Sequence, residues 1–189
     1  MPYSNNFFDK KIGEILEYIK PNKFYDFGAG AGKYGDIIKE KSKRTYSIAI
    51  ESEKDYIEKF NLVSKYNKVF NFSILNFLHH SYYNNDFDVV MFGDVIEHLK
   101  KSDGLDLLNF LVYRTRWIIV EFPQKYLQNP VDGHFSEAHI SIWGKNDFCG
   151  FDVSDLINQS GQCLIIIKGY LEDKITIKQM NNVLNSHEK

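Results

Sequence analysis

Short apolar runs alternate with longer amphipathic stretches along most of this 189-residue chain. The runs are rich in Ile, Val, Phe and Tyr and have the length of buried strands; they cover residues 23–27, 45–50, 68–72, 87–92 and 117–121. Between them, apolar residues lie three or four positions apart, which predicts helices over residues 6–20, 33–41, 53–64 and 102–113. This alternation indicates βαβ units, and therefore a doubly wound, mostly parallel α/β sheet with helices on both faces.

Polar residues next to these helices are the expected caps. Ser52 precedes the third helix, and Ser102 or Asp103 opens the fourth, because a short oxygen-bearing side chain can accept a bond from the first free backbone amides. After the fifth strand the pattern changes. Residues 123–144 contain two histidines and little periodicity, and a long irregular loop inside a compact domain is usually functional. A short helix is expected over residues 144–149.

The last part of the chain is expected to complete a seven-stranded sheet. Residues 151–157 and 162–169 are the predicted sixth and seventh strands, and a tight turn between them makes an antiparallel hairpin. A second register also fits, with residues 163–168 paired to 174–178. The polar tail from Asn181 is expected to fray, so residues 170–189 form a C-terminal extension.

Length and composition favour one globular domain over residues 1–189. Apolar residues make up 43% of the chain, which excludes a disordered protein, and a net charge of −2 gives no general attraction to nucleic acid or to an anionic membrane. No stretch reaches the length of a membrane helix, and no apolar signal core opens the chain. Cys149 and Cys163 are expected to be buried free thiols, which suits the cytoplasm. The oligomeric state stays open.

A glycine-rich turn follows the first predicted strand, in the sequence FYDFGAGAGKYG of residues 24–35. Glycine adopts φ > 0 and has no Cβ, so its backbone can approach a ligand closely. The spacing Gly30-x-Gly32-x-x-Gly35 satisfies the dinucleotide fingerprint, with Glu51 about 20 residues on as the ribose acid. A nucleotide-binding module of the NAD type is therefore one interpretation of this turn.

The residues around the glycines separate the ligand classes. Phe27 stands where a phosphate-binding loop begins with Gly, and Tyr34 stands where that loop has its magnesium-binding Ser or Thr, so the phosphate-loop interpretation fails. Asp26 lies two residues before the first glycine, at the end of the strand. A carboxylate there would repel a diphosphate and attract a ligand with an ammonium and a sulfonium group.

This pattern resembles motif I of the class I S-adenosylmethionine (SAM)-dependent methyltransferases, D-x-G-x-G-x-G. The resemblance recurs at Ile48–Glu51 and at Phe87–Leu99 and covers about residues 20–169. It implies a methyltransferase domain with SAM as cofactor and S-adenosylhomocysteine as product. It also implies that the helix in residues 1–20 is a lid over the SAM pocket or a plain packing helix, and that the 123–144 loop closes over the methyl acceptor.

Polar residues follow the carboxyl end of each predicted parallel strand, where ligands of doubly wound sheets bind. Glu51 has two oxygens for the ribose hydroxyls, Asp26 would act on the ammonium group, and the residues after the third strand would hold adenine. The predicted cofactor-binding residues are Asp26, Gly28, Ala29, Gly30, Glu51, Ser52, Ile74, Asn76, Gly93 and Asp94.

Methyl transfer is an in-line displacement, so the protein mainly has to align the acceptor, the methyl group and the sulfur. A hydroxyl or ammonium acceptor also needs a base. Histidine has an unperturbed pKa near neutrality, so His98 and His139 are predicted to be catalytic together with Asp94. His134 and Glu121 are further candidate bases. The expected partner is a small-molecule substrate, such as a metabolite or a sugar- or peptide-derived compound, with nucleic acid not favoured.

One alternative assigns the stretch Asp94-x-x-Glu97-His98 to a metal. It resembles the E-x-x-E-H metal site of small-RNA 3′-end methyltransferases, with His134 or His139 as the distant ligand, and carboxylates with imidazoles suit divalent cations. That interpretation makes the chain a metal-assisted RNA 2′-O-methyltransferase. We expect instead that the stretch forms the floor of the SAM pocket and that no metal is bound. A SAM-binding pseudoenzyme without turnover is the remaining alternative.

Overall fold

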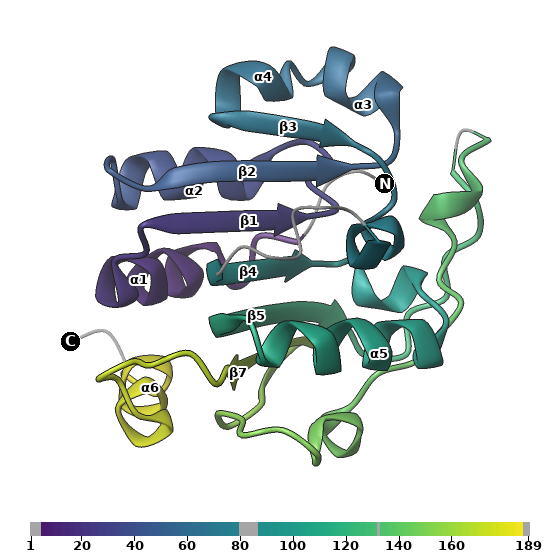
Figure 1. The fold of residues 1–189 in the computed structure, drawn as a ribbon. Coiled ribbons are helices and arrows are strands. Elements are labelled where there is room, and N and C mark those ends of the chain that lie inside the picture. Colours follow the sequence, from purple (N-terminus) through teal and green to yellow (C-terminus); the bar gives the residue numbers. More distant parts are fainter. Residues whose placement is uncertain (1–4, 80–86, 132, 187–189) are drawn as a thin grey trace.

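A computed structural model describes residues 5–79, 87–131 and 133–186 and contains one seven-stranded sheet (Figure 1). The strand order is β3-β2-β1-β4-β5-β7-β6; β1 to β5 are parallel, and β7 runs antiparallel to both β5 and β6. The doubly wound α/β fold with an antiparallel hairpin is therefore confirmed. The strands are β1 (Lys23–Phe27), β2 (Tyr46–Glu51), β3 (Lys68–Asn71), β4 (Phe87–Gly93), β5 (Thr115–Pro123), β6 (Ile157–Gln159) and β7 (Gln162–Lys168).

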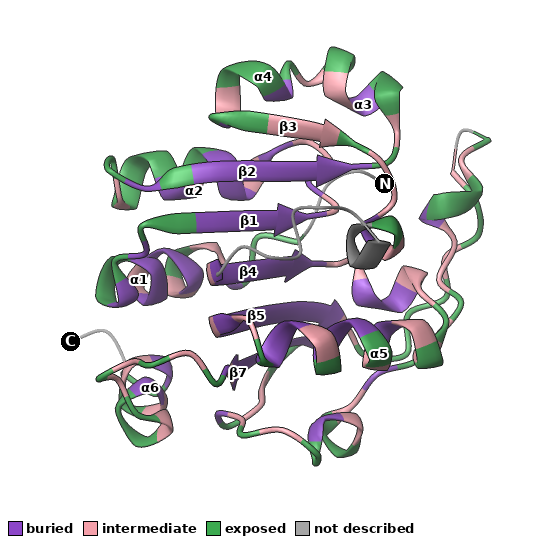
Figure 2. Cartoon of the chain, in the orientation of Figure 1, coloured by how far each residue is buried: buried purple, intermediate pink, exposed green. Residues whose placement is uncertain are grey.

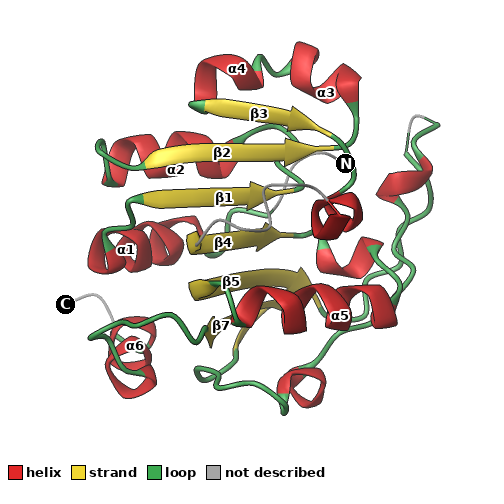
Figure 3. Cartoon of the chain, viewed as in Figure 1, coloured by secondary structure: helices red, strands yellow, loops and turns green. Residues whose placement is uncertain are grey.

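Helices cover both faces of this sheet (Figure 3). The α-helices are α1 (Asp9–Ile19), α2 (Lys33–Lys41), α3 (Lys54–Lys59), α4 (Leu62–Lys65), α5 (Lys101–Val112) and α6 (Ile177–Leu184). The short 3-10 helices are η1 (Ile74–His79), η3 (Ile96–His98), η4 (Phe135–Glu137) and η5 (Lys145–Phe148). One apolar cluster joins α1, α2 and α6 to the sheet, and a second joins α5, η3 and η5 to the opposite face.

Side chains alternate between these two faces along each strand, as the pleat of a strand requires. Tyr25 and Phe27 belong to the cluster on the α5 face, whereas Phe24 belongs to the cluster on the α1 and α2 face. The central strands β1, β4 and β5 are buried over most of their length (Figure 2). Asp26 therefore points into the layer of α2, and Glu121, between Val120 and Phe122, does the same on β5.

Chain order reverses between β1 and β4. From β1 the chain proceeds outward to β2 and β3, then returns to β4 beside β1 and proceeds the other way. The carboxyl ends of β1 and β4 lie at this switch point, which is where open α/β sheets bind ligands. The segment after β5 extends beside these strand ends (Figure 1). The structure therefore brings the glycine turn, the end of β4 and the 123–144 loop to one edge of the sheet.

Several sequence-based predictions about local structure are wrong. The predicted helix over residues 53–64 is two helices, α3 and α4, because Asn61 between them has a left-handed backbone with φ 48°. The predicted caps also differ: Glu53 rather than Ser52 precedes α3, and Lys100 precedes α5. Residues 151–156 lie outside the named strands, and Val153 makes only an isolated bridge to Ile167.

The tail after β7 also differs from the prediction. Residues 177–184 form α6, begun by a capping box in which Thr176 accepts from the Gln179 amide, and Met180 and Leu184 are buried against the sheet. The 174–178 strand register therefore does not occur. Cys163 is buried as predicted, but Cys149 is exposed. Of the helices in the described residues, none combines the length and apolar character needed to cross a membrane.

The N-terminal helix α1 packs on the sheet rather than over the ligand edge. Its buried residues Ile12, Ile15 and Leu16 join the cluster on the α2 face. The residues before it approach the strand ends, where the Asn5 amide donates to Asp94 Oδ2 at 3.1 Å. The lid role expected of residues 1–20 stays a prediction, and Asn5 and Phe7 are the described residues of that segment that line a cavity at this edge.

Candidate active site

Two neighbouring cavities open at the carboxyl edge of the sheet. The first has a volume of about 280 Å³ and lies between the glycine turn, the end of β2, the start of η1 and the end of β4. Eight predicted cofactor residues line it, namely Gly28, Ala29, Gly30, Glu51, Ser52, Ile74, Gly93 and Asp94. We call this the turn cavity. Asn76 does not line it, because that residue is exposed on the outer side of η1.

Gly28 shows why the turn needs glycine. Its φ is 74°, and a Cβ at this position would lie 2.6 Å from Val95 Cγ2. Its backbone amide donates to the Ile50 carbonyl at 2.8 Å, which holds the turn against the end of β2. Any other residue would strain the backbone and also collide with the floor of the cavity.

Glu51 is the acid that the fold orients toward this turn. Its Oε2 accepts from the Gly30 amide at 2.7 Å and its Oε1 from the Glu53 amide at 2.9 Å. Each oxygen keeps a lone pair, so the carboxylate is held in place and can still accept from a ligand. Burial raises the pKa of Glu51, and the two amide bonds oppose that rise. The prediction of a preset ribose-binding acid fits this geometry.

Asp26 does not line the turn cavity. It is fully buried, accepts a short hydrogen bond from the Tyr66 hydroxyl and faces the α2 layer because it lies between Tyr25 and Phe27 on the strand. The same hydroxyl accepts from the Gly35 amide at 2.9 Å. Burial raises the pKa of Asp26 to about 7. Asp26 thus supports the glycine turn through Tyr66, and its predicted contact with a ligand ammonium group stays a prediction.

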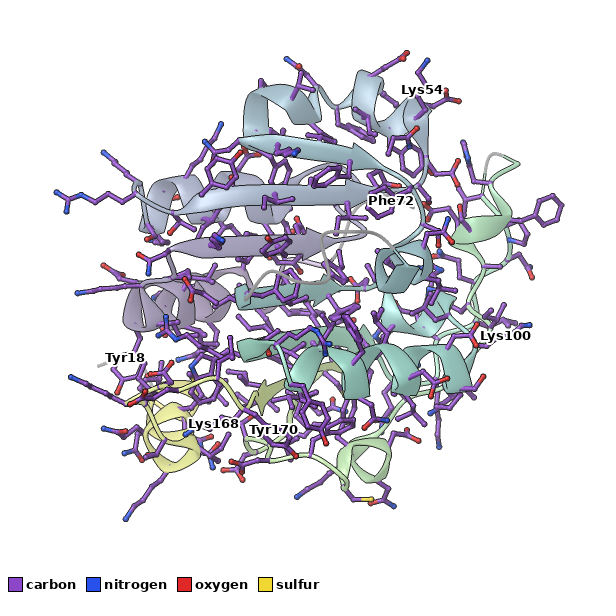
Figure 4. The ribbon with its side chains drawn as sticks, in the orientation of Figure 1. Tyr18, Lys54, Phe72, Lys100, Lys168 and Tyr170 are labelled. Atoms are coloured by element: carbon purple, nitrogen blue, oxygen red, sulfur yellow. The ribbon has the colours of Figure 1, made fainter. Side chains whose placement is uncertain are left out.

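The charge of the turn cavity nevertheless favours a cationic ligand. Among the described residues that line it, four are acids, Glu51, Glu53, Asp94 and Glu137, and none is Lys or Arg. Lys54, next to Glu53, points away from the molecule (Figure 4), and its side chain is 75% exposed. A diphosphate would find no lysine or arginine among these lining residues to offset the four carboxyl groups. These four acids, rather than Asp26, give the cavity its preference for positive charge.

The second cavity has a volume of about 580 Å³ and lies between the N-terminal segment, the end of β5, the segment after β5 and the turn before β7. We call it the loop cavity. Asp94 and His98 line both cavities, and His139 and Glu97 line the loop cavity. Two predicted catalytic residues, Asp94 and His98, therefore lie where the two cavities meet, and His139 lies beside His98 in the loop cavity.

Asp94 is held by partners from distant parts of the chain. Its φ is 54°, and its backbone amide donates to the Glu121 carbonyl at 2.9 Å. The Gln162 side chain donates to Asp94 Oδ1 and also lies 3.3 Å from Glu121 Oε1. Burial raises the pKa of Asp94 and raises that of Glu121 to about 7. Glu121 is fully buried and bonded to Tyr34, so it has no access to an acceptor.

The orientation of both histidines follows from backbone carbonyls. His98 Nδ1 lies 3.1 Å from the Ala138 oxygen, and His139 Nδ1 lies 2.8 Å from the Tyr126 oxygen. A carbonyl only accepts, so each Nδ1 carries the proton and each Nε2 carries a lone pair. Burial lowers the pKa of His98, which favours the neutral ring. The two imidazole rings pack edge to face, with 4.7 Å between their centroids.

Glu97, His98 and His139 form a group that has the composition of a metal site. One ligand atom from each lies within 4.8 Å of the others. Both Glu97 oxygens are buried without a hydrogen-bond partner in the described part of the chain, and burial raises the pKa of this carboxyl well above its ordinary value. A carboxylate with two imidazole lone pairs fits a divalent cation. His134, the other predicted distant ligand, is not in this group.

The segment after β5 also reaches over the turn cavity. Ser136 Oγ donates to Glu53 Oε1 at 2.8 Å, His134 Nδ1 lies 3.0 Å from Glu53 Oε2, and the His134 ring packs against Tyr56 at 5.0 Å. Ser136 and Glu137 line the cavity with Glu53 and Tyr56. The sequence reasoning missed these four residues, because no motif marks them and only the folded loop brings them to α3.

The base of this segment is fixed under the site by Trp143. Its Nε1 donates to the Ile96 carbonyl at 3.0 Å, and the ring packs so closely on α5 that a Cβ at Gly104 would lie 2.7 Å from it. The Ile140 and Ser141 amides donate to the Glu97 carbonyl at 2.9 and 3.1 Å. Trp143 thus anchors the base of this segment under η3, which carries Glu97 and His98.

Compared by sequence, the chain matches no protein-family model and no curated protein. Compared by structure, it is similar to a SAM-dependent methyltransferase from Clostridium acetobutylicum, with TM-score 0.65 and 10% identity over 85% of this chain and 90% of that one. The N-terminal domain of EvdMO1, crystallised in the presence of S-adenosylhomocysteine and D-fucose, gives TM-score 0.61 and 11% identity over 88% and 84%.

A third similar structure is an O-methyltransferase family protein from Burkholderia thailandensis, with TM-score 0.61 and 10% identity over 85% of this chain. The chain spans only 56% of that longer protein. With the glycine turn and the acid at the end of β2, these similarities show that the chain has the class I methyltransferase fold.

Proposed function

We propose that this protein transfers a methyl group from SAM to a hydroxyl of a small-molecule acceptor. One observation carries the proposal: Asp94 and His98 line both the turn cavity and the loop cavity. A transferase needs its two substrates to meet at such a boundary. The fold, and neighbours such as the EvdMO1 domain with bound S-adenosylhomocysteine, support SAM as the cofactor.

The turn cavity holds the cofactor in this proposal. Glu51 accepts from the ribose hydroxyls, Ile74 packs on adenine, and the backbone at Gly28 and Gly30 lies against the methionine part. When bound, SAM supplies an electrophilic methyl on a positively charged sulfur. The acidic wall of Glu53, Asp94 and Glu137 stabilises that positive charge, and it discriminates against a nicotinamide dinucleotide.

The boundary residues activate the acceptor. His98 Nε2 has a lone pair because its Nδ1 donates to a carbonyl, so it can take the proton that the acceptor hydroxyl loses. The lowered pKa of His98, caused by burial, keeps the ring neutral near pH 7. Asp94 orients the acceptor hydroxyl, and His139 fixes the wall beside it. Alignment by these groups is expected to be the main catalytic effect.

Calorimetric titration with SAM, S-adenosylhomocysteine and NAD tests the proposal directly. We expect both adenosyl compounds to bind with micromolar or tighter affinity and NAD to show no saturable heat. Binding of NAD without binding of either adenosyl compound would overturn the proposal and favour the nucleotide-binding module. Binding of SAM without transfer to any hydroxyl acceptor would favour the pseudoenzyme.

The metal-assisted RNA alternative has one observation in its favour, the group of Glu97, His98 and His139. Against it, the described lining of the turn cavity is acidic, and a net charge of −2 gives no general attraction to a phosphate backbone. Dialysis against EDTA followed by titration with Mg²⁺, Mn²⁺ and Zn²⁺ separates the two. A cation requirement together with methylation of single-stranded RNA would establish the alternative.

A further inference from the structure

The loop cavity has an unusual lining for a small-molecule pocket. Among the described residues that surround it there is no Ala, Val, Leu, Ile or Met. The apolar side chains that line it are two aromatic rings, Phe7 and Tyr126, and Pro123. Sites for flat or apolar ligands are usually lined by aliphatic and aromatic side chains. Because the described lining of this cavity has no aliphatic side chain of that kind, the cavity suits a more polar class of molecule.

Four carboxamides line the same cavity, and each has one side-chain atom that no described residue uses. Asn5 Oδ1 accepts from the Phe7 amide and Gln124 Oε1 accepts from Asn158, which leaves Asn5 Nδ2 and Gln124 Nε2 as donors. Gln128 Nε2 donates to the Glu137 carbonyl and Gln162 Nε2 to Asp94, which leaves two Oε1 acceptors.

This mixture of donors and acceptors fits hydroxyl groups. Each hydroxyl donates one hydrogen bond and accepts others, so a molecule with several hydroxyls can satisfy both kinds of atom at once. An aromatic acceptor with one hydroxyl would leave most of the amides unpaired, and each unpaired polar group costs free energy when water is displaced. The pattern therefore favours several hydroxyls over one.

The charges and the rings of the cavity narrow the class further. Asp94 and Glu97 face it, and Lys125 is the one lysine among the described lining residues, so a phosphorylated acceptor would meet repulsion at the reacting end. The Phe7 and Tyr126 side chains are 43% and 61% exposed. Their electron-rich ring faces can pack against the C–H faces of a saturated ring.

We propose that the acceptor is an uncharged polyhydroxylated molecule, a sugar or sugar-like polyol, bound in the loop cavity with one hydroxyl between Asp94 and His98. This rests on the proposed methyl transfer and specifies its substrate class. In the reaction, the acceptor oxygen forms a bond to the methyl carbon as the carbon–sulfur bond breaks. The hydroxyl proton passes to His98 Nε2, and S-adenosylhomocysteine leaves as a neutral thioether.

Saturation-transfer NMR tests this on the full chain with excess S-adenosylhomocysteine. The probes are methyl hexopyranosides and methyl deoxyhexopyranosides, a hexose phosphate, and catechol. The signal of at least one neutral glycoside should reach saturation as its concentration rises. The hexose phosphate should bind at least about tenfold more weakly, a factor worth 1.4 kcal/mol. Catechol should give no saturable signal. Tighter binding of the phosphate or of catechol would overturn the proposal.

Variants connect any glycoside signal to the cavity. Gln128→Ala removes an acceptor, and Phe7→Leu removes a ring face while keeping an apolar side chain. Each should weaken the glycoside at least about threefold, less than the cost of one typical hydrogen bond. Gln159→Ala, an exposed glutamine on β6 outside the cavity, is the matched control and should change nothing. Glycoside affinity equal to that of the native protein in all three variants would overturn the assignment of the glycoside to the loop cavity.

Binding of S-adenosylhomocysteine distinguishes a failure of the proposed methyl transfer from a failure of the proposed acceptor class. If S-adenosylhomocysteine fails to bind, the proposed function fails, and the acceptor class fails with it. If S-adenosylhomocysteine binds and no glycoside or free polyol gives a saturable signal, only the acceptor class is wrong. All variants should retain the native affinity for S-adenosylhomocysteine, which shows that they are folded.

Discussion

The turn cavity and the loop cavity share a wall but are built differently. The turn cavity is formed by strand ends and the short turns that follow them, and backbone amides hold its key acid, Glu51, from two sides. The loop cavity is formed by the N-terminal segment, the segment after β5 and the turn before β7, which lie far apart in sequence. The sheet thus dictates the first cavity, whereas the second depends on how loops pack against one another.

This difference fits two separate tasks, cofactor binding by the turn cavity and acceptor binding by the loop cavity. A cofactor common to many enzymes can be bound by features that any doubly wound sheet supplies at its switch point. An acceptor particular to one enzyme needs side chains that vary without disturbing the sheet, and loops provide them. Asp94 and His98 belong to both cavities, so changes there should affect the two substrates differently.

The largest expected effect is at the boundary. His98→Ala should reduce methyl transfer by about 10²–10⁴-fold, the range for loss of a general base, and change the affinity for S-adenosylhomocysteine by less than about threefold. His139→Ala should show the same separation with a smaller loss of turnover. Transfer of radiolabelled methyl and calorimetry measure the two quantities. Equal losses in turnover and cofactor affinity would assign His98 to the cofactor instead.

The next effect tests the turn cavity. Glu51→Ala should weaken binding of SAM by about 1–3 kcal/mol, because charge-assisted hydrogen bonds to the ribose are lost. Glu58→Ala, which removes an exposed acid from neighbouring α3, is the matched control and should leave the affinity unchanged. Calorimetry checks both. Native affinity in the Glu51 variant would show that the ribose lies elsewhere.

A stability measurement tests the structural role of Asp26. Its folded-state pKa of about 7 lies above the ordinary value of 3.8, so the folded protein holds a proton that the unfolded chain loses. Stability from this group is present at low pH and is lost as pH rises toward 7. The free energy of unfolding should therefore fall by about 1 kcal/mol between pH 6 and pH 7 because of Asp26 alone.

Asp26→Asn should remove that part of the pH dependence, since asparagine can still accept from Tyr66 and does not titrate. The exposed Asp106→Asn on α5 should leave it unchanged. Urea unfolding at a series of pH values measures both. The Asp26 variant should also keep its affinity for SAM; a loss like that of Glu51→Ala would restore the direct contact with the cofactor.

The smallest effect concerns the loop tip over the turn cavity. His134→Ala removes the contact with Glu53 and the packing on Tyr56, and a partly exposed pair of this kind contributes about 1 kcal/mol or less. S-adenosylhomocysteine should therefore bind slightly more weakly and dissociate faster in stopped-flow measurements. A loss greater than that of Glu51→Ala would break the comparison, because the loop would then hold the cofactor more strongly than the strand ends.

Much of the sheet was predictable because the pattern of apolar residues within each element indicates its type. The apolar runs ending at Phe27 and Phe92 match β1 and β4 closely, and the helix over residues 33–41 is α2. The errors lie where local signals are weak. Residues 151–156 are apolar enough for a strand but lie outside the named ones, and the polar tail forms α6 because its few apolar residues meet the sheet.

By itself, the sequence determined the order of strands and helices, the glycine turn and the acids that follow the strands, because periodicity and φ > 0 requirements are properties of neighbouring residues. Only the tertiary structure decided which of those acids line the cavity at the switch point. The strand pleat turned Asp26 toward Tyr66, while the end of β2 left Glu51 facing the turn. It also brought Gln162, Gln128 and His139 to one cavity, since contacts between residues so far apart depend on how the whole chain packs.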